Sequence, residues 1–128
     1  MSYEVEEIPD EDTLYYRIHK TEFRDGKVIP GAFKERGEGD RKGMSTNWDK
    51  YSDPDDLISD REEPNNYGVV NLNVAKVRMI EELSVEHNPL PDNRAHSHVL
   101  GIPANKPFKT KVRLKLQGIY EWNIHVNR

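Results

Sequence analysis

The sequence predicts a single compact α+β domain with a mainly antiparallel, curved sheet and two or three short helices. Its length of 128 residues fits one domain of the commonest size. Several short segments alternate apolar and polar residues, as strands with one buried face do, while other segments show helical spacing. Hydrophobic residues make up 34% of the chain and charged residues 33%, so we expect a small core with long surface loops.

The chain begins with an acidic arm and a strand. Residues 1–12, MSYEVEEIPDED, end at a turn signal, so we expect a flexible N-terminal arm that precedes a domain of residues 13–128. Residues 13–20, TLYYRIHK, concentrate aromatic and β-branched side chains and predict the first strand. On that strand Arg17 and His19 share one face, where they either point at one ligand or face solvent.

A loop, a short helix and a central strand follow. Residues 22–42 are rich in glycine and predict a long loop anchored by Ala32 and Phe33. The Ser-Asp-Pro sequence at residues 52–54 signals the start of a short helix. Residues 67–73, YGVVNLN, then predict the clearest central strand of the chain.

The C-terminal half predicts a helix, two strands and an ambiguous segment. Residues 74–83 space their apolar side chains as a short amphipathic helix does. Residues 84–101, SVEHNPLPDNRAHSHVLG, predict a strand, a proline-containing turn and a second strand. From Val112 onward the even positions are mostly apolar, which predicts one long strand bent at Gly118. The competing interpretation is a helix over residues 109–117 followed by a strand.

The composition excludes several classes of site. The chain has no cysteine, which excludes disulfides, thiolate metal sites and cysteine nucleophiles and fits a reducing compartment. No apolar run approaches the roughly 20 residues of a membrane-spanning helix, and the acidic N-terminus does not resemble a signal peptide. We therefore expect a soluble, cytoplasmic protein with no membrane partner.

The net charge of −4 is unevenly distributed along the chain. Residues 1–64 carry 18 acidic and 10 basic side chains, whereas residues 65–128 carry 5 acidic and 9 basic ones. Such a distribution can steer an anionic partner to the basic side of the molecule. Alternatively, the two halves neutralise each other once the chain is folded.

Residues 43–52, GMSTNWDKYS, combine hydroxyl, amide and aromatic side chains within a few positions. Ser45 and Thr46 could hydrogen-bond a ribose, and Trp48 and Tyr51 could stack on a ring. In the other interpretation, the two aromatic side chains pack into the core. The segment therefore predicts either one wall of a ligand pocket or the buried end of a strand.

Three histidines lie close together in the sequence, at positions 87, 96 and 98. With Asp92 they could form a zinc or iron site, but their spacing matches no strong metal motif, so we predict no metal. Two of them, His87 and His96, could instead act as the acid and base of a nuclease, since histidine titrates near neutral pH. The third possibility is that these histidines only hydrogen-bond the backbone.

A further set of residues occurs in a characteristic order. Arg17 lies on the first strand, Ser45 and Thr46 open a later segment, the strand of residues 67–73 follows, and Glu121 lies on the last strand. This order resembles that of the ADP-ribosyltransferase superfamily and of the small RES-type domains that consume NAD. The resemblance implies that Arg17 orders the dinucleotide, the hydroxyls hold the nicotinamide ribose, and Glu121 assists departure of nicotinamide. The chain lacks a complete Ser-Thr-Ser sequence and a second glutamate two positions before Glu121.

The chain also resembles a small prokaryotic domain family that carries patterns such as GMSTNWDKYS and HNPLPDNRAHS, a resemblance that implies no particular activity. Together the observations predict a pocket that acts on NAD or another nucleotide-like small molecule. Its expected catalytic residues are Arg17, Ser45, His87, His96 and Glu121. Its expected cofactor-binding residues are Arg17, Thr46, Trp48 and Tyr51.

The alternative function is that of a non-enzymatic module that binds a protein partner or a nucleic acid. A run of basic residues without an intervening acid supports it, with Tyr120 and Trp122 nearby as rings for base stacking. That run comprises Lys106, Lys109, Lys111, Arg113 and Lys115. No recognisable nucleic-acid-binding motif accompanies the run, so nucleic acid is the less favoured partner.

Overall fold

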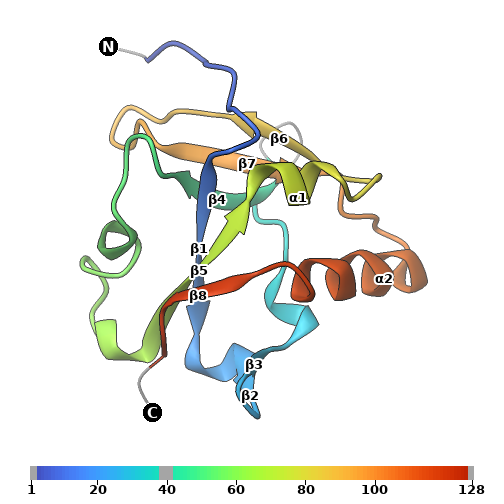
Figure 1. The fold of residues 1–128 in the computed structure, drawn as a ribbon. Helices are drawn as coiled ribbons and strands as arrows, with labels where there is room; N and C mark the ends of the chain where they lie inside the picture. The colour runs from blue at the N-terminus through green and yellow to red at the C-terminus, as the bar shows by residue number, and fades with distance from the viewer. Residues whose placement is uncertain (1–2, 38–41, 127–128) are drawn as a thin grey trace.

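The computed structural model describes residues 3–37 and 42–126 (Figure 1). The fold is α+β, as predicted, and its main element is a six-stranded sheet in the order β6-β7-β4-β1-β5-β8. All neighbouring strands of this sheet pair antiparallel. The strands are β1 (Thr13–His19), β4 (Met44–Trp48), β5 (Tyr67–Asn73), β6 (Ser84–His87), β7 (His96–Leu100) and β8 (Glu121–Ile124).

One face of the sheet supplies the core. On β1 the side chains of Leu14, Tyr16 and Ile18 are buried, while the alternate residues are half-buried. This is the period-two pattern from which the strand was predicted. The helix α2 (Lys106–Gln117) packs against the 3₁₀ turn Pro30–Ala32 and adds its apolar side chains to the same core.

The segment that became α2 confirms the alternative of a helix over residues 109–117 followed by a strand, and the interpretation as one long strand from Val112 is wrong. Val112 and Leu116, one helical turn apart, are both fully buried, whereas Leu114 between them is 51% exposed. A strand would have buried all three side chains on one face, so the helical spacing decides the structure. Pro107 lies in the first turn of α2, and Gly118 caps its end by donating to the carbonyl of Leu114.

The first helix is shorter than predicted. α1 covers Val74–Arg78 rather than residues 74–83. The amide of Ile80 donates to the carbonyl of Val77, three residues earlier instead of four, and this change of hydrogen-bond spacing ends the α-helix. Ile80 and Leu83 nevertheless stay buried, so the apolar spacing that predicted the helix still anchors the turn that follows it.

The expected loop of residues 22–42 contains a hairpin of β2 (Phe23–Arg24) and β3 (Lys27–Val28). Both turn residues, Asp25 and Gly26, have positive φ, as a two-residue hairpin turn requires. Ala32 and Phe33 are fully buried and anchor the segment after the hairpin, as predicted.

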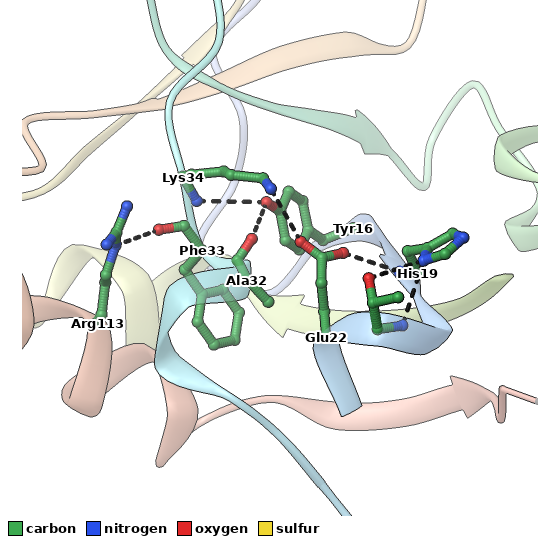
Figure 2. Close-up of polar contacts among 8 residues, drawn as sticks. Tyr16, His19, Glu22, Ala32, Phe33, Lys34 and Arg113 are labelled. Carbon is green, nitrogen blue, oxygen red and sulfur yellow. Dashed lines mark hydrogen bonds and ion pairs between the residues drawn. The ribbon is translucent and has the colours of Figure 1, made fainter. Parts of the chain in front are cut away.

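Hydrogen bonds hold this loop segment against β1 and α2 (Figure 2). The hydroxyl of Tyr16 donates to the carbonyl of Ala32 at 2.5 Å and accepts from the amide of Lys34. From α2, Arg113 Nε donates to the carbonyl of Phe33 at 2.7 Å. These bonds fix the chain that leads to Arg36, which lies at the site described below.

The N-terminal arm makes specific contacts with the domain. Ile8 is 2% exposed. Trp48 Nε1 donates to a carboxylate oxygen of Asp12 at 2.9 Å, and Arg78 pairs with Asp10 at 2.6 Å. Residues 8–12 therefore bridge β4 and α1.

Candidate functional site

A cavity opens between β1 and β4, the two central strands of the sheet. β1 pairs with β5 over seven residues, but it pairs with β4 only through Leu14↔Trp48 and Tyr15↔Asn47. Beyond these pairs lies a cavity of about 310 Å³, within the usual size range of small-molecule sites. It is lined by Tyr16, Arg17, Arg36, Ser45, Thr46, Asn47, Asp56, Leu57, Asp60, Arg61, Asn93 and His96.

The segment between β4 and β5 covers the cavity from outside. It contains the 3₁₀ turn Pro54–Leu57, where a short helix was predicted, and Asp53 and Asp56 cap that turn reciprocally. Figure 1 shows this segment (green) and α2 (orange-red) on opposite sides of β1. Leu57 is buried, and its carbonyl accepts a hydrogen bond from Arg17 Nη1 at 3.3 Å.

Three arginines converge on this cavity. The guanidiniums of Arg17 and Arg61 lie 5.5 and 6.0 Å from the centre of the Tyr67 ring, and Arg36 lines the same space. Burial, together with the charges of Arg61 and Arg36, lowers the pKa of Arg17 from its ordinary value. Since arginine stays protonated at neutral pH, the Arg17 guanidinium carries its charge in a half-buried position near two other cations, where a bound anion would stabilise it.

The carboxylates of the cavity are already engaged. Asp60 lies 3.7 Å from Arg61 Nε with its side chain 76% exposed, and Asp56 accepts from the amide of Asp53 and from the hydroxyl of Ser52. Within the described part of the chain, Arg17 makes no ion pair with a carboxylate. The half-buried guanidinium of Arg17 is therefore the group best placed to bind a negatively charged ligand.

The contacts of His96 orient its ring toward the cavity. Its Nδ1 lies 2.8 Å from the carbonyl of Asn88, and because a carbonyl can only accept, Nδ1 carries the proton. In the neutral ring, Nε2 is then the acceptor and lies 3.4 Å from the hydroxyl oxygen of Ser45. The arrangement gives the cavity a proton acceptor next to a hydroxyl group.

Two asparagines support this wall. Asn93 Nδ2 donates to Asn47 Oδ1 at 2.9 Å, and Asn93 Oδ1 accepts from the amide of Ala95. These bonds connect the turn before β7 to β4. Thr46 belongs to the opposite face of β4, where it is buried and donates to the carbonyl of Ser97. The Thr46 hydroxyl thus already donates its hydrogen bond within the protein, although the residue lines the cavity.

Three predicted site residues lie around the N-terminal arm instead of the cavity. His87 is 1% exposed; its Nδ1 accepts from the amide of Glu6 and its Nε2 donates to the carbonyl of Arg94. Trp48 is 1% exposed and packs edge-on against His87, and Tyr51 bonds the carboxylate of Glu6. Their contacts fit the core and backbone-bonding interpretations of these side chains.

Glu121 is also separate from this cavity. It lies on β8 and lines a second cavity of about 340 Å³ together with Asn71, Asn73, Lys76 and others. The structure thus brings Arg17, Ser45 and His96 together, with Thr46 adjacent, but does not add Glu121. Of the residues whose order along the chain resembled an NAD site, Glu121 alone lies apart from this cavity.

Comparison with protein-family models, curated proteins and solved structures finds no significant match. The geometry of the site is therefore the basis for the function proposed below.

Two arginines of the site, Arg36 and Arg61, were missed by the sequence analysis. Both lie in irregular segments, where no periodicity indicates the direction of a side chain. Arg61 reaches the site because the turn Pro54–Leu57 folds back over β1, and Arg36 because its backbone pairs with Gly43 next to β4. No local pattern marks either residue: Arg36 lies in the loop before β4, and Arg61 lies in the long segment between β4 and β5.

Among residues 3–37 and 42–126, no three histidine or carboxylate side chains are grouped so that they could hold a metal ion. In the same part of the chain, no helix has the length and apolar character needed to cross a membrane.

His98 packs against His96, and the burial of the His98 ring can be tested through its pKa. Its ring packs against Gly43, 4.8 Å from the centre of the His96 ring. Burial, and then the proximity of His96, lowers the pKa of His98 below its ordinary value of 6.5.

A lowered histidine pKa makes stability depend on pH. The unfolded chain binds a proton at His98 more readily than the folded protein does, so the stabilising contribution is present above about pH 6.5 and is lost as pH falls. We expect the free energy of unfolding, measured by urea titration, to decrease from about pH 7 to about pH 5. The variant His98→Gln should show a smaller decrease, and an equal decrease in both proteins would contradict the assignment.

Proposed function

We propose that the cavity between β1 and β4 binds a nucleotide-class ligand, with NAD as the first candidate, and that His96 accepts a proton in a reaction on that ligand. The observation that carries this proposal is the convergence of three arginines on a cavity that also contains the Ser45–His96 pair. A cytoplasmic location is part of the proposal, since the chain contains no cysteine.

The arginines supply the affinity for phosphate. A guanidinium presents several N–H donors in a plane and binds phosphate oxygens in pairs. Arg17 is oriented for this role by its bond to the Leu57 carbonyl and by the Tyr67 ring beside it. A bound phosphate would stabilise the charged form of Arg17, whose pKa is lowered by burial and then by the charges of Arg61 and Arg36.

In the proposed reaction, His96 acts as the proton acceptor. With its proton on Nδ1, the His96 ring can take a proton at Nε2 from a water molecule or from a ribose hydroxyl group. The Ser45 hydroxyl, 3.4 Å away, would orient that group by hydrogen bonding. The proposal assigns no role to Glu121, which lines the second cavity, or to the buried His87.

Thermal denaturation in the presence of NAD, ADP-ribose and AMP tests the binding. A ligand at one hundred times its dissociation constant stabilises the folded state by about 2.7 kcal/mol, which corresponds to a rise of several degrees in Tm. We expect at least one of these nucleotides to raise the Tm. Arg17→Ala and, independently, Arg61→Ala should abolish the shift, because each removes a guanidinium from the cavity.

Arg24→Ala is the matched control, since this exposed arginine lies on the β2–β3 hairpin away from the cavity. It should leave the nucleotide-induced shift unchanged. The absence of a shift with every nucleotide, or an equal loss in Arg24→Ala, would contradict the proposal.

A further inference from the structure

We infer that the ligand of this site is a single-stranded nucleic acid, of which one nucleotide occupies the cavity between β1 and β4. This inference rests on the proposed nucleotide binding and extends it to the neighbouring surface. The cavity is not isolated: two further cavities share parts of its lining, so that all three form one groove. We call this groove the arginine groove, because Arg36 lines all three of its parts.

One end of the arginine groove lies toward the end of β1. There a cavity of about 350 Å³ shares Arg17, Arg36 and Arg61 with the central one and adds His19 and Lys34. Lys34 Nζ lies 3.2 Å from Glu22, and its side chain is 43% exposed, so the ammonium group remains accessible. This end therefore presents Lys34 beyond the arginines, together with the carboxylate of Glu22, which lines the same cavity.

The other end lies over β7 and the turn before it. A cavity of about 450 Å³ shares Arg36, Ser45 and His96 with the central one and adds His98 and the partly exposed Leu90. This end offers the His96 ring and an apolar side chain rather than further cations, since His98 is only 6% exposed. Such surfaces contact the faces of bases, which are apolar and stack on flat groups.

The size and chemistry of the groove fit a polymer better than a single nucleotide. Each of the three parts has the volume of one small-ligand pocket, so a mononucleotide that fills the centre leaves both ends empty. A nucleic acid repeats a phosphate and a base at every residue, which matches a groove with cations at its centre and flat rings toward both ends. In a duplex the bases are paired and stacked inside, so only a single strand can place them in such recesses.

Flat groups are available for stacking within the described part of the groove. The Tyr67 ring has two guanidiniums near it and lies edge-on to the His19 ring at 5.0 Å. The His96 ring lies edge-on to the buried His98 ring at 4.8 Å, so His96 is the ring available at that end. Guanidinium planes and imidazole rings both stack on nucleic-acid bases.

The basic run of α2, which first suggested nucleic-acid binding, contributes nothing to the arginine groove. Arg113 bonds the carbonyl of Phe33, Lys115 lies 3.9 Å from Glu82, and no residue of α2 lines any of the three cavities. The two surfaces can therefore be separated by mutation, and α2 provides a control of similar charge.

Fluorescence anisotropy with labelled oligonucleotides tests the inference. The probes are oligo-dT and oligo-rU of two, four and eight nucleotides at low salt, with AMP as an unlabelled competitor. We expect the affinity for the octamer to exceed that for the dimer by at least tenfold, since the octamer fills all three parts of the groove. The affinity should fall as salt is raised, because phosphate contacts release counterions. The two sugar types distinguish DNA from RNA as the ligand.

Variants locate the binding. Lys34→Ala, at one end of the groove, should weaken octamer binding severalfold and leave competition by AMP unchanged. The double variant Lys109→Ala/Lys111→Ala on α2 should leave both unchanged. Octamer binding that is no tighter than dimer binding, or that is lost in the α2 variant but retained in Lys34→Ala, would overturn the inference while the proposed function stands. No binding of either the octamer or any nucleotide would overturn both.

Discussion

Replacing Gly101 by alanine is expected to lower the free energy of unfolding by roughly 3 kcal/mol. Gly101 has φ of +104°, a conformation that residues with a Cβ rarely adopt. A Cβ at this position would also lie 2.1 Å from the carbonyl oxygen of Glu82. That oxygen belongs to the backbone just before β6, so it cannot rotate away as a side chain would, and the chain itself must move.

Urea denaturation of Gly101→Ala and of a matched glycine variant measures this effect. Gly31 has an ordinary backbone conformation and no heavy atom within 4 Å of a Cβ built there. Gly31→Ala should therefore change the stability by less than about 0.5 kcal/mol. If the two variants proved equally stable, the close contact between Gly101 and Glu82 would not exist in solution.

Replacing His87 by alanine is the second change with a large expected effect. His87 is 1% exposed, accepts from the amide of Glu6 at 2.9 Å and donates to the carbonyl of Arg94 at 2.7 Å. The substitution leaves a cavity beside Trp48 and two part-buried polar groups, the Glu6 amide and the Arg94 carbonyl, without partners. Each effect is destabilising, and together they should cost about 2–4 kcal/mol.

The same variant separates a structural role of His87 from a catalytic one. At a temperature where His87→Ala is still folded, we expect nucleotide binding equal to that of the unchanged protein, because His87 does not line the cavity between β1 and β4. His125→Ala, at an exposed position, is the control for loss of a histidine and should be nearly neutral. A stable His87→Ala protein that had lost its reaction but not its binding would restore the catalytic assignment.

Most of the sheet could be predicted because its strands have one buried face. β1 and β5 were identified from local alternation and residue type, and the histidine-rich segment was correctly divided into two strands. The prediction left a strand and a helix open at α2, because Val112 and Leu116 satisfy a period of two as well as a helical period. Only Leu114 distinguishes the strand from the helix, because a strand would bury it and the helix exposes it. Its exposure depends on which elements pack against the segment.

The candidate site could be predicted only in part. Arg17, Ser45 and His96 were identified from residue type and converge on one cavity. Arg36 and Arg61 could not be identified, since their positions depend on how irregular segments fold over the sheet. The charge distribution was also a poor guide: the three arginines and Lys34 all come from the acidic first half of the chain, because charge along a sequence does not determine charge on a surface.

The short pairing between β1 and β4 divides the sheet into two three-stranded halves, β6-β7-β4 and β1-β5-β8. Arg17 belongs to one half, whereas Ser45 and His96 belong to the other. A ligand held by all three residues would connect the two halves where few backbone bonds do so. The affinity for this ligand would therefore be thermodynamically coupled to the angle between the two halves of the sheet. A substitution that alters this angle would change the affinity even if the substituted residue does not contact the ligand.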